Sequence, residues 1–161
     1  MTTTPETPPA RRSPRLNDDE IWEFVTDAHT GVMTTLRRDG MPIALPLWYM
    51  VVDRAIYTSS RGKKLVRLAN NSKASFLVET GDMWVDLKAA HFTGTASIIE
   101  PDATLLAKLN AENNRKYARF RPPSNDLPDS AKQVYANTMQ WIRFVPDPRV
   151  LSWENARLVG R

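Results

Sequence analysis

GVMTTLRRDGMPIALPLWYMVVDRAIYTSS, residues 31–60, contains three β-rich runs separated by two short polar turns. In the first run, Val32, Thr34 and Leu36 share one face of a strand, because side chains alternate between the two faces. The Asp-Gly pair at 39–40 is a strong hairpin signal between β-rich runs. A second turn at 53–54 precedes the last run, AIYTSS. The stretch therefore predicts a meander of antiparallel strands.

The middle run is expected to form one long strand from about Pro42 to Val52. Pro46 lies inside this run, and a proline cannot donate a hydrogen bond to a β-ladder. The strand is therefore expected at an edge of the sheet, or with a bulge at the proline.

The rest of the chain alternates between helical and β-rich patterns. Asn17 and Glu20 have the spacing of a capping box, which predicts that a helix begins there. A bulge is expected near Gly94, because glycine inside a strand pattern often marks one. The other predicted elements are a short helix at 63–71, a strand at 72–80, one long strand or two within 83–100, helices at 102–120 and 129–139, and two final strands within 141–158, separated by Pro146 and Pro148.

These elements sum to about six antiparallel strands with helices at the edges. We expect a mainly β, α+β fold, a six-stranded antiparallel barrel, because closure removes exposed strand edges. Residues 16–161 are predicted to form this single domain. Residues 1–15 are rich in proline and arginine and are predicted to be disordered, because they have little apolar surface to bury.

Composition excludes several classes of protein. The chain has 161 residues, no cysteine and two histidines, so disulfide scaffolds and thiolate metal sites are excluded, and no metal site is expected. No apolar run is long enough to span a bilayer, and the first residues lack the apolar core of a signal peptide. We therefore expect a cytoplasmic protein that makes no contact with a membrane.

The end of the third run carries a candidate phosphate site. Hydroxyls of Thr58, Ser59 and Ser60 are followed by the cations of 61–64 (Arg-Gly-Lys-Lys), just where a helix is predicted to begin. A phosphate needs hydroxyl and amide donors and positive charge, and a helix N-terminus adds its dipole. On composition alone, a solvated polar turn is the more common explanation of such a segment.

The order and spacing of these motifs resemble the pyridoxamine 5'-phosphate oxidase-like split barrels, and most closely their flavin/deazaflavin oxidoreductase class B branch. The resemblance is carried by four segments and covers about residues 16–160. They are TGVMTTLRRDGMPIALPLWYMVV (30–52), IYTSSRGKKLVRLANNSKASFLVETGD (56–82), FTGTASIIE (92–100) and LSWENARL (151–158).

The resemblance implies an FMN-binding type of split barrel, a cofactor and an oxidoreductase activity. The cofactor is FMN or coenzyme F-420, and the class B features favour F-420. The expected reaction transfers a hydride or electrons between the cofactor and a small organic substrate, which the sequence does not identify. No catalytic residue is predicted, since the cofactor carries the chemistry.

The resemblance also implies particular binding residues. Lys64, with Ser59 and Ser60, matches the phosphate-binding positions of the family, and we expect Thr58, Arg61 and Lys63 to assist. A C-terminal tryptophan is expected to approach the cofactor held mainly by the other subunit, which implies a homodimer with sites at the interface. The remaining candidates are Pro46, Leu47, Trp48 and Tyr49 along the cofactor ring, and Trp153 with Arg157 from the second subunit. If Arg37, Arg38, Arg61 and Lys63 converge, they could hold the anionic tail of F-420.

Two other functions are considered. The same fold could serve as a non-catalytic carrier or sensor of flavin, deazaflavin or haem. A basic β-barrel could instead bind single-stranded nucleic acid through Trp48, Tyr49 and Tyr57. The net charge of +4 is modest and spread along the chain, so we do not expect nucleic-acid binding.

Overall fold

A computed structural model describes residues 13–121, 127–130, 132 and 139–160. The predicted tail, residues 1–15, and the predicted helix at 129–139 lie largely outside these residues. The described helices are α1 (Asp18–Asp27), α2 (Lys63–Asn70), α3 (Ala103–Tyr117) and α5 (Ala156–Val159), with 3-10 turns η1 (Trp84–Asp86) and η2 (Ala118–Phe120). The strands are β1 (Gly31–Leu36), β2 (Pro42–Leu47), β3 (Met50–Val52), β4 (Ala55–Ser60), β5 (Lys73–Thr80), β6 (Lys88–Ile99) and β7 (Gln140–Glu154).

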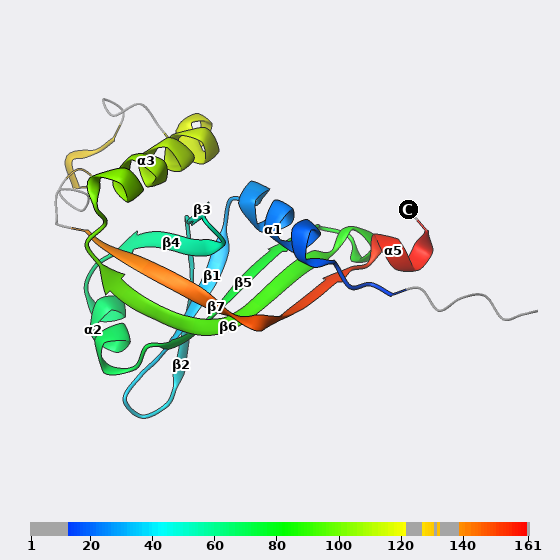
Figure 1. The fold of residues 1–161 in the computed structure, drawn as a ribbon, viewed down its shortest axis with the longest axis horizontal. Helices are drawn as coiled ribbons and strands as arrows, with labels where there is room; N and C mark the ends of the chain where they lie inside the picture. The colour runs from blue at the N-terminus through cyan, green and yellow to red at the C-terminus, as the bar shows by residue number, and fades with distance from the viewer. Residues whose placement is uncertain (1–12, 122–126, 131, 133–138, 161) are drawn as a thin grey trace, which may run out of the picture.

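The strands form one antiparallel, curled sheet in the order β2-β1-β5-β6-β7-β4-β3 (Figure 1). The prediction of a mainly β antiparallel split barrel is therefore confirmed. The strand count is seven rather than about six. The single strand predicted for 42–52 is two strands. Pro46 lies on β2, an edge strand, as expected from its missing donor.

The break between β2 and β3 has a topological reason. β2 pairs only with β1 and β3 only with β4, so the two strands lie at opposite edges of the sheet. Only Trp48 and Tyr49 connect them. A two-residue connection is short, so the sheet curls until its two edges lie next to each other.

Two further predictions about strands were wrong. Residues 83–87 form η1 and its flanks instead of strand, so the long strand begins at Lys88. The C-terminal runs form one strand, β7, across both prolines. Pro148 is tolerated because it lies where pairing with β6 is interrupted, between the pairs Gly94↔Pro146 and Phe92↔Val150. The predicted bulge near Gly94 is thereby confirmed.

The core lies inside the curl of the sheet. Side chains of Phe76, Phe92 and Phe144 are fully buried there, and α1 contributes Ile21 and Val25. α1 begins with the predicted capping box, in which Asn17 and Glu20 bond each other's backbone N–H. α2 and α3 lie on the side of the barrel away from the long ends of β6 and β7, which carry α5 (Figure 1).

We predict that Gly94→Ala destabilises the fold by about 3 kcal/mol, because a Cβ there would lie 2.2 Å from the backbone oxygen of Val145. Gly40→Ala is the control. Unlike Gly94, Gly40 has a positive φ of 83°, but open space surrounds it, so only conformational strain of about 1 kcal/mol is expected. Urea unfolding of both variants measures the difference. A loss of less than about 0.5 kcal/mol in Gly94→Ala would show that the close approach at the bulge contributes nothing.

Candidate functional site

The site lies where β4 ends and α2 begins. Ser59 and Ser60 are half-buried at the end of β4, opposite Trp141 and Gln140 of β7. Gly62, with φ 66° and ψ −138°, turns the chain into α2, a conformation that favours glycine. Among the residues that the structure describes, no side chain caps α2 at its N-terminus. The first turn of this helix therefore keeps backbone donors beside the two hydroxyls.

Arg61 and Lys64 add positive charge that is partly withdrawn from water. The Nη1 atom of Arg61 is buried and has no hydrogen-bond partner among the described residues. A buried cationic donor without an acceptor is costly, so this atom is ready to receive one. Lys64 is half-buried, and its burial, followed by repulsion from Arg67, lowers its pKa. A nearby anion would relieve both costs.

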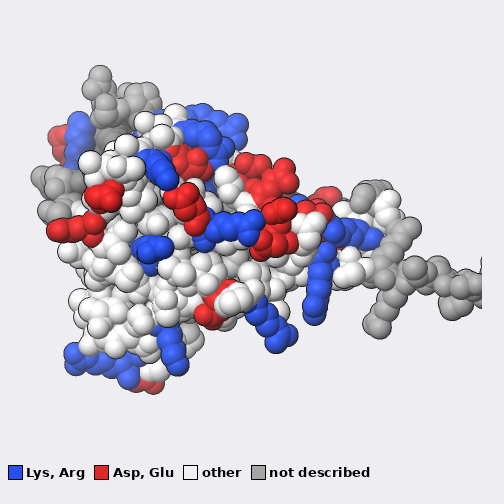
Figure 2. All heavy atoms as spheres, viewed as in Figure 1, with Lys and Arg blue, Asp and Glu red and all other residues white. Residues whose placement is uncertain are grey.

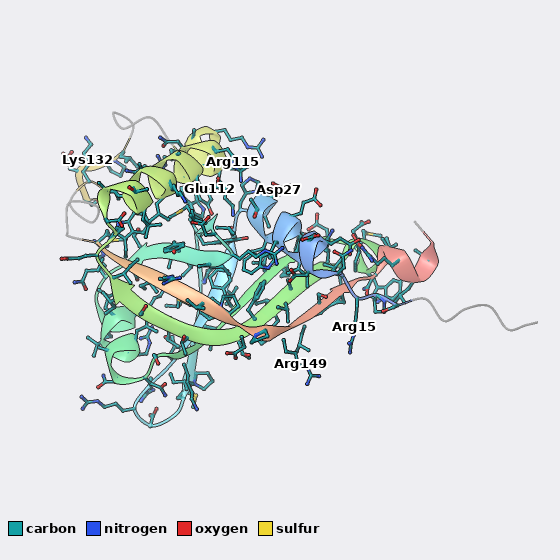
Figure 3. The ribbon with its side chains drawn as sticks, viewed as in Figure 1. Arg15, Asp27, Glu112, Arg115, Lys132 and Arg149 are labelled. Atoms are coloured by element: carbon teal, nitrogen blue, oxygen red, sulfur yellow. The ribbon has the colours of Figure 1, made fainter. Side chains whose placement is uncertain are left out.

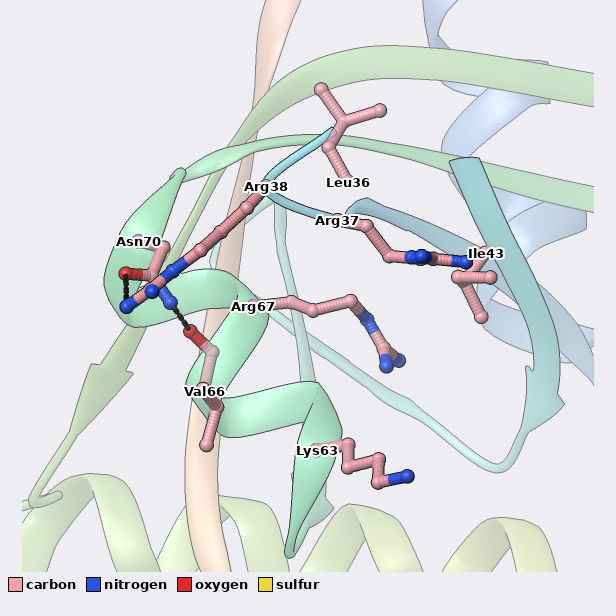
Figure 4. A pocket seen from close by; sticks show the side chains of 8 residues that line it. All are labelled: Leu36, Arg37, Arg38, Ile43, Lys63, Val66, Arg67 and Asn70. Atoms are coloured by element: carbon pink, nitrogen blue, oxygen red, sulfur yellow. Dashed lines mark hydrogen bonds between the residues drawn. The ribbon is translucent and has the colours of Figure 1, made fainter. Parts of the chain in front are cut away.

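From the cationic junction of β4 and α2, a groove continues between α2 and the β1–β2 hairpin (Figure 4). Its volume is about 520 Å³. Of the four cations that the sequence suggested for an anionic tail, three line the groove, namely Arg37, Arg38 and Lys63. The fourth, Arg61, is not part of the lining, whereas Arg67 is. The apolar floor consists of Leu36, Ile43 and Val66, and Asn70 is the remaining polar residue of the lining.

The cations of this groove differ in how firmly they are held. Arg67 donates from Nε to the hydroxyl of fully buried Thr35, at 2.7 Å, and its other nitrogens point into the groove (Figure 4). Arg37 pairs with Asp39 at 2.7 Å, and Arg38 reaches Asn70 at 3.4 Å. In Figure 2, Lys and Arg side chains predominate at the end of the molecule formed by this hairpin.

Thr58 does not share the arrangement of the two serines. It is buried, and its hydroxyl donates to the backbone oxygen of Trp48 at 2.9 Å. This hydroxyl is thus engaged within the protein. Its contact joins β4 to the connection between β2 and β3.

The four residues expected along the cofactor ring fall into two groups. Pro46 and Trp48 are exposed, Trp48 to 43%. Leu47 packs against the core, and Tyr49 is fully buried with its hydroxyl donating to the backbone oxygen of Val25 at 2.6 Å. The side chains available to a ligand here are therefore those of Pro46 and Trp48.

Trp153 and Arg157 lie at the opposite end of the chain's fold. Trp153 lies near the end of β7, opposite Ala89, and is 38% exposed. Arg157 bonds Glu154 at 2.5 Å and Glu20 at 2.6 Å. Both belong to the part of the molecule that carries α5, remote from α2 (Figure 1). Within one chain the structure does not bring them to the groove.

A second set of polar residues supports the connection between β2 and β3 from α3. Lys116 is 3% exposed, and its ammonium lies 3.7 Å from the centroid of the Tyr49 ring and 3.3 Å from the backbone oxygen of Val25. Burial lowers its pKa to about 7. The neighbouring charges of Asp27, Glu112 and Arg115 lie at the surface between α1 and α3 (Figure 3).

The two histidines lie apart from the groove. His29 follows α1 and meets the rings of Tyr117 and Phe120, and burial is the main cause of its lowered pKa. His91 lies in β6, half-buried. Within the described ranges, no three His, Asp or Glu side chains are grouped as metal ligands.

Comparison with known proteins identifies the family. The sequence matches the pyridoxamine 5'-phosphate oxidase family over residues 18–146, most of the chain. The chain therefore belongs to this family. Among curated proteins, none matches the sequence closely. Within the described part of the chain, no helix has the length and apolar character needed to cross a membrane.

Solved structures share the fold. A conserved hypothetical protein from Mycobacterium tuberculosis is 26% identical with a TM-score of 0.72, over 97% of this chain and 94% of that one. An FAD-binding protein from Mesorhizobium loti is 20% identical with a TM-score of 0.62, over 85% and 93%. The heme-storage protein HutZ from Vibrio cholerae is 15% identical with a TM-score of 0.61, over 86% and 97%. The fold thus occurs in proteins named for different ligands.

Sequence reasoning missed two residues of this region. Arg67 could have been found, because it lies four residues after Lys63 and therefore on the same face of α2. Tyr117 bonds both backbone groups of Tyr49. No local pattern marks it, since the two residues are 68 positions apart in the sequence.

We predict that the free energy of unfolding rises with pH from 7 to 9.5 because of Lys116. Its pKa is about 7 in the folded chain and returns toward 10.5 on unfolding, so the unfolded chain holds the extra proton in this range. The rise is at most about 1.4 kcal/mol per pH unit, the value for one proton. The pKa values of Tyr49 and Tyr117 are raised by burial, so neither hydroxyl ionises in this window.

Urea titrations at each pH measure this slope. Lys116→Met removes this titrating group and keeps most of its apolar volume, so the variant should lose most of the rise, and the lowered pKa of Lys64 accounts for a smaller rise that remains. A slope that persists undiminished in the variant would assign the effect to other groups.

Proposed function

We propose that the protein is a flavin- or deazaflavin-dependent oxidoreductase. It binds FMN or coenzyme F-420 and transfers a hydride or electrons between that cofactor and a small organic substrate. The family and the FAD-binding neighbours support a flavin-type cofactor. The choice of residues rests on the geometry of this chain.

The observation that carries the proposal is the buried Nη1 of Arg61. It lies on the residue after Ser60, directly before the uncapped N-terminus of α2. A phosphate group would supply the acceptor that this atom lacks, and it would also accept from the serine hydroxyls and the backbone amides of α2. Lys63 and Lys64 would balance its charge. The residues present therefore fit a phosphate-bearing cofactor.

The cofactor would supply the redox chemistry, and the chain's residues would bind and orient it. Pro46 and the exposed part of Trp48 would lie along its ring. Thr58 would act indirectly, by fixing the backbone of Trp48 next to the two serines. These roles require no acid–base side chain in the groove, and among its described lining residues there is neither a histidine nor a carboxylate.

The groove favours F-420 over FMN. FMN has a single phosphate, whereas F-420 also carries an oligoglutamate tail with several carboxylates. Arg37, Arg38, Lys63 and Arg67 give the groove four cations beyond Arg61 and Lys64. A cationic groove of this extent is useful to an extended anion and exceeds the needs of one phosphate.

A homodimer would complete the site in this proposal. Trp153 is partly exposed on an end of the fold remote from its own groove, so it could reach only the groove of another copy. Arg157 is held by Glu20 and Glu154 within its own chain, so we assign it to the support of this end rather than to direct contact.

A non-catalytic carrier or sensor is the second candidate. The same absence of acid–base groups from the described lining of the groove favours it, and HutZ shows that this fold is found in a heme-storage protein. Reduction of an acceptor by the loaded protein, over repeated turnovers, distinguishes the enzyme from the carrier.

We predict that Lys64→Ala weakens cofactor binding by about 1.5–3 kcal/mol, or about tenfold to 150-fold, through loss of a charge-assisted hydrogen bond. Arg61→Met should weaken binding similarly without lowering the stability of the cofactor-free protein, because the lost donor has no partner among the described residues. Fluorescence titration with FMN and F-420 measures affinity, and urea unfolding measures stability.

The matched control is Lys73→Ala, which removes an exposed lysine from the start of β5. It should leave affinity unchanged. Unaltered affinity in both Lys64→Ala and Arg61→Met would remove the β4–α2 junction from the cofactor site.

We predict that the double substitution Arg37→Ala with Arg38→Ala separates the two cofactors. Affinity for F-420 should fall by about tenfold or more, because charge-assisted contacts to its tail are lost. Affinity for FMN should change less than about twofold, since its phosphate is held at the β4–α2 junction. Titration at low and high salt should show a steeper salt dependence for F-420. Equal losses for both ligands would contradict the assignment of the groove to the tail.

A further inference from the structure

Tyr117 is the last residue of α3, and it is fully buried. Its hydroxyl accepts from the backbone N–H of Tyr49 at 2.8 Å. The hydroxyl proton lies within reach of the backbone oxygens of Tyr49 at 2.7 Å and His29 at 2.9 Å. Tyr49 lies between two strands, so the sheet leaves its backbone N–H and oxygen without partners. The hydroxyl of Tyr117 supplies a partner for both.

The ring of Tyr117 also fixes the neighbouring residue. Trp48 stacks on it with centroids 4.4 Å apart and planes 7° from parallel. The hydroxyl of Thr58 donates a hydrogen bond to the backbone oxygen of Trp48. The carbonyl of Trp48, the amide that follows it and the indole ring are thus all held, while 43% of the side chain stays exposed.

This arrangement exceeds what packing requires. A buried phenylalanine would fill the same space and keep a ring beside the indole, but it would leave the two backbone groups of Tyr49 without partners and so release the backbone that sets the direction of Trp48. An exposed tryptophan normally samples several rotamers, and one that is held in a single orientation loses less entropy when a ligand binds.

We infer that Tyr117 is a positioning residue, which holds the indole of Trp48 in the orientation that receives the ring of the cofactor. The inference rests on the proposed function, and it adds α3 to a site otherwise built from β2, β4 and α2. Tyr117 itself touches no ligand in this arrangement, since it is completely buried.

The test is a double-mutant cycle on cofactor affinity with Tyr117→Phe and Trp48→Ala. Tyr117→Phe keeps the stacked ring and removes only the hydroxyl, and it should weaken binding of F-420 or FMN about threefold to tenfold, the worth of a lost hydrogen bond. In the Trp48→Ala background the same change should have no further effect. Non-additivity of this kind is the signature of a residue that acts through another.

Tyr57→Phe is the matched control. Tyr57 is buried in the same apolar cluster, and no hydrogen bond of its hydroxyl is present among the described residues. It should leave affinity unchanged in both backgrounds. Acrylamide quenching of Trp48 emission, taken as the difference from Trp48→Phe, should increase in Tyr117→Phe and not in Tyr57→Phe. A purely structural role would alter stability without this change in quenching.

The outcomes separate the two levels of the proposal. If the wild type binds a cofactor and the effects of Tyr117→Phe and Trp48→Ala simply add, the positioning role is overturned and the proposed function stands. If Tyr117→Phe binds as well as the wild type, the positioning role is likewise overturned. If the wild type binds neither cofactor at micromolar concentration, both proposals fail.

Discussion

The structure depends on the connection of two residues between β2 and β3. Because Trp48 and Tyr49 join the two edges of the sheet, the sheet has to curl until those edges meet. A curled antiparallel sheet of this kind encloses the phenylalanine core and leaves few open edges. The connection interrupts the ladder, so its polar groups need partners from elsewhere, and Thr58 and Tyr117 provide them.

The candidate site follows from the same geometry. β3 and β4 form a hairpin, so the end of β4 returns beside the connection, and Thr58 bonds Trp48 there. The chain then continues through Ser59 and Ser60 into α2, whose residues Lys63 and Arg67 line the groove. The connection, the β4–α2 junction and the groove are thus joined along the chain. In the proposed function they would receive the ring, the phosphate and the anionic tail of the cofactor.

Positive charges in this region are partly buried, which costs free energy, and an anionic ligand would reduce that cost. Lys64 is partly buried beside Arg67, and a buried nitrogen of Arg61 has no acceptor among the described residues. Lys116, on the far side of the connection, is likewise buried, but it is stabilised by the ring of Tyr49 and the oxygen of Val25. Lys64 and Arg61 indicate a binding site, and Lys116 indicates structural support. Of these two groups, only the first adjoins the open groove.

The sequence by itself determined the local features: the capping box at Asn17, the restriction of Pro46 to an edge or a bulge, the bulge at Gly94 and the cluster of hydroxyls and cations at 58–64. Each depends on neighbouring residues and on rules of backbone geometry. Only the tertiary structure decided that residues 42–52 divide at Trp48, that β7 continues through its prolines, and that Arg67 and Tyr117 join this region. Those outcomes depend on which strands pair and on contacts between residues far apart in the chain, as in the 68 positions between Tyr49 and Tyr117.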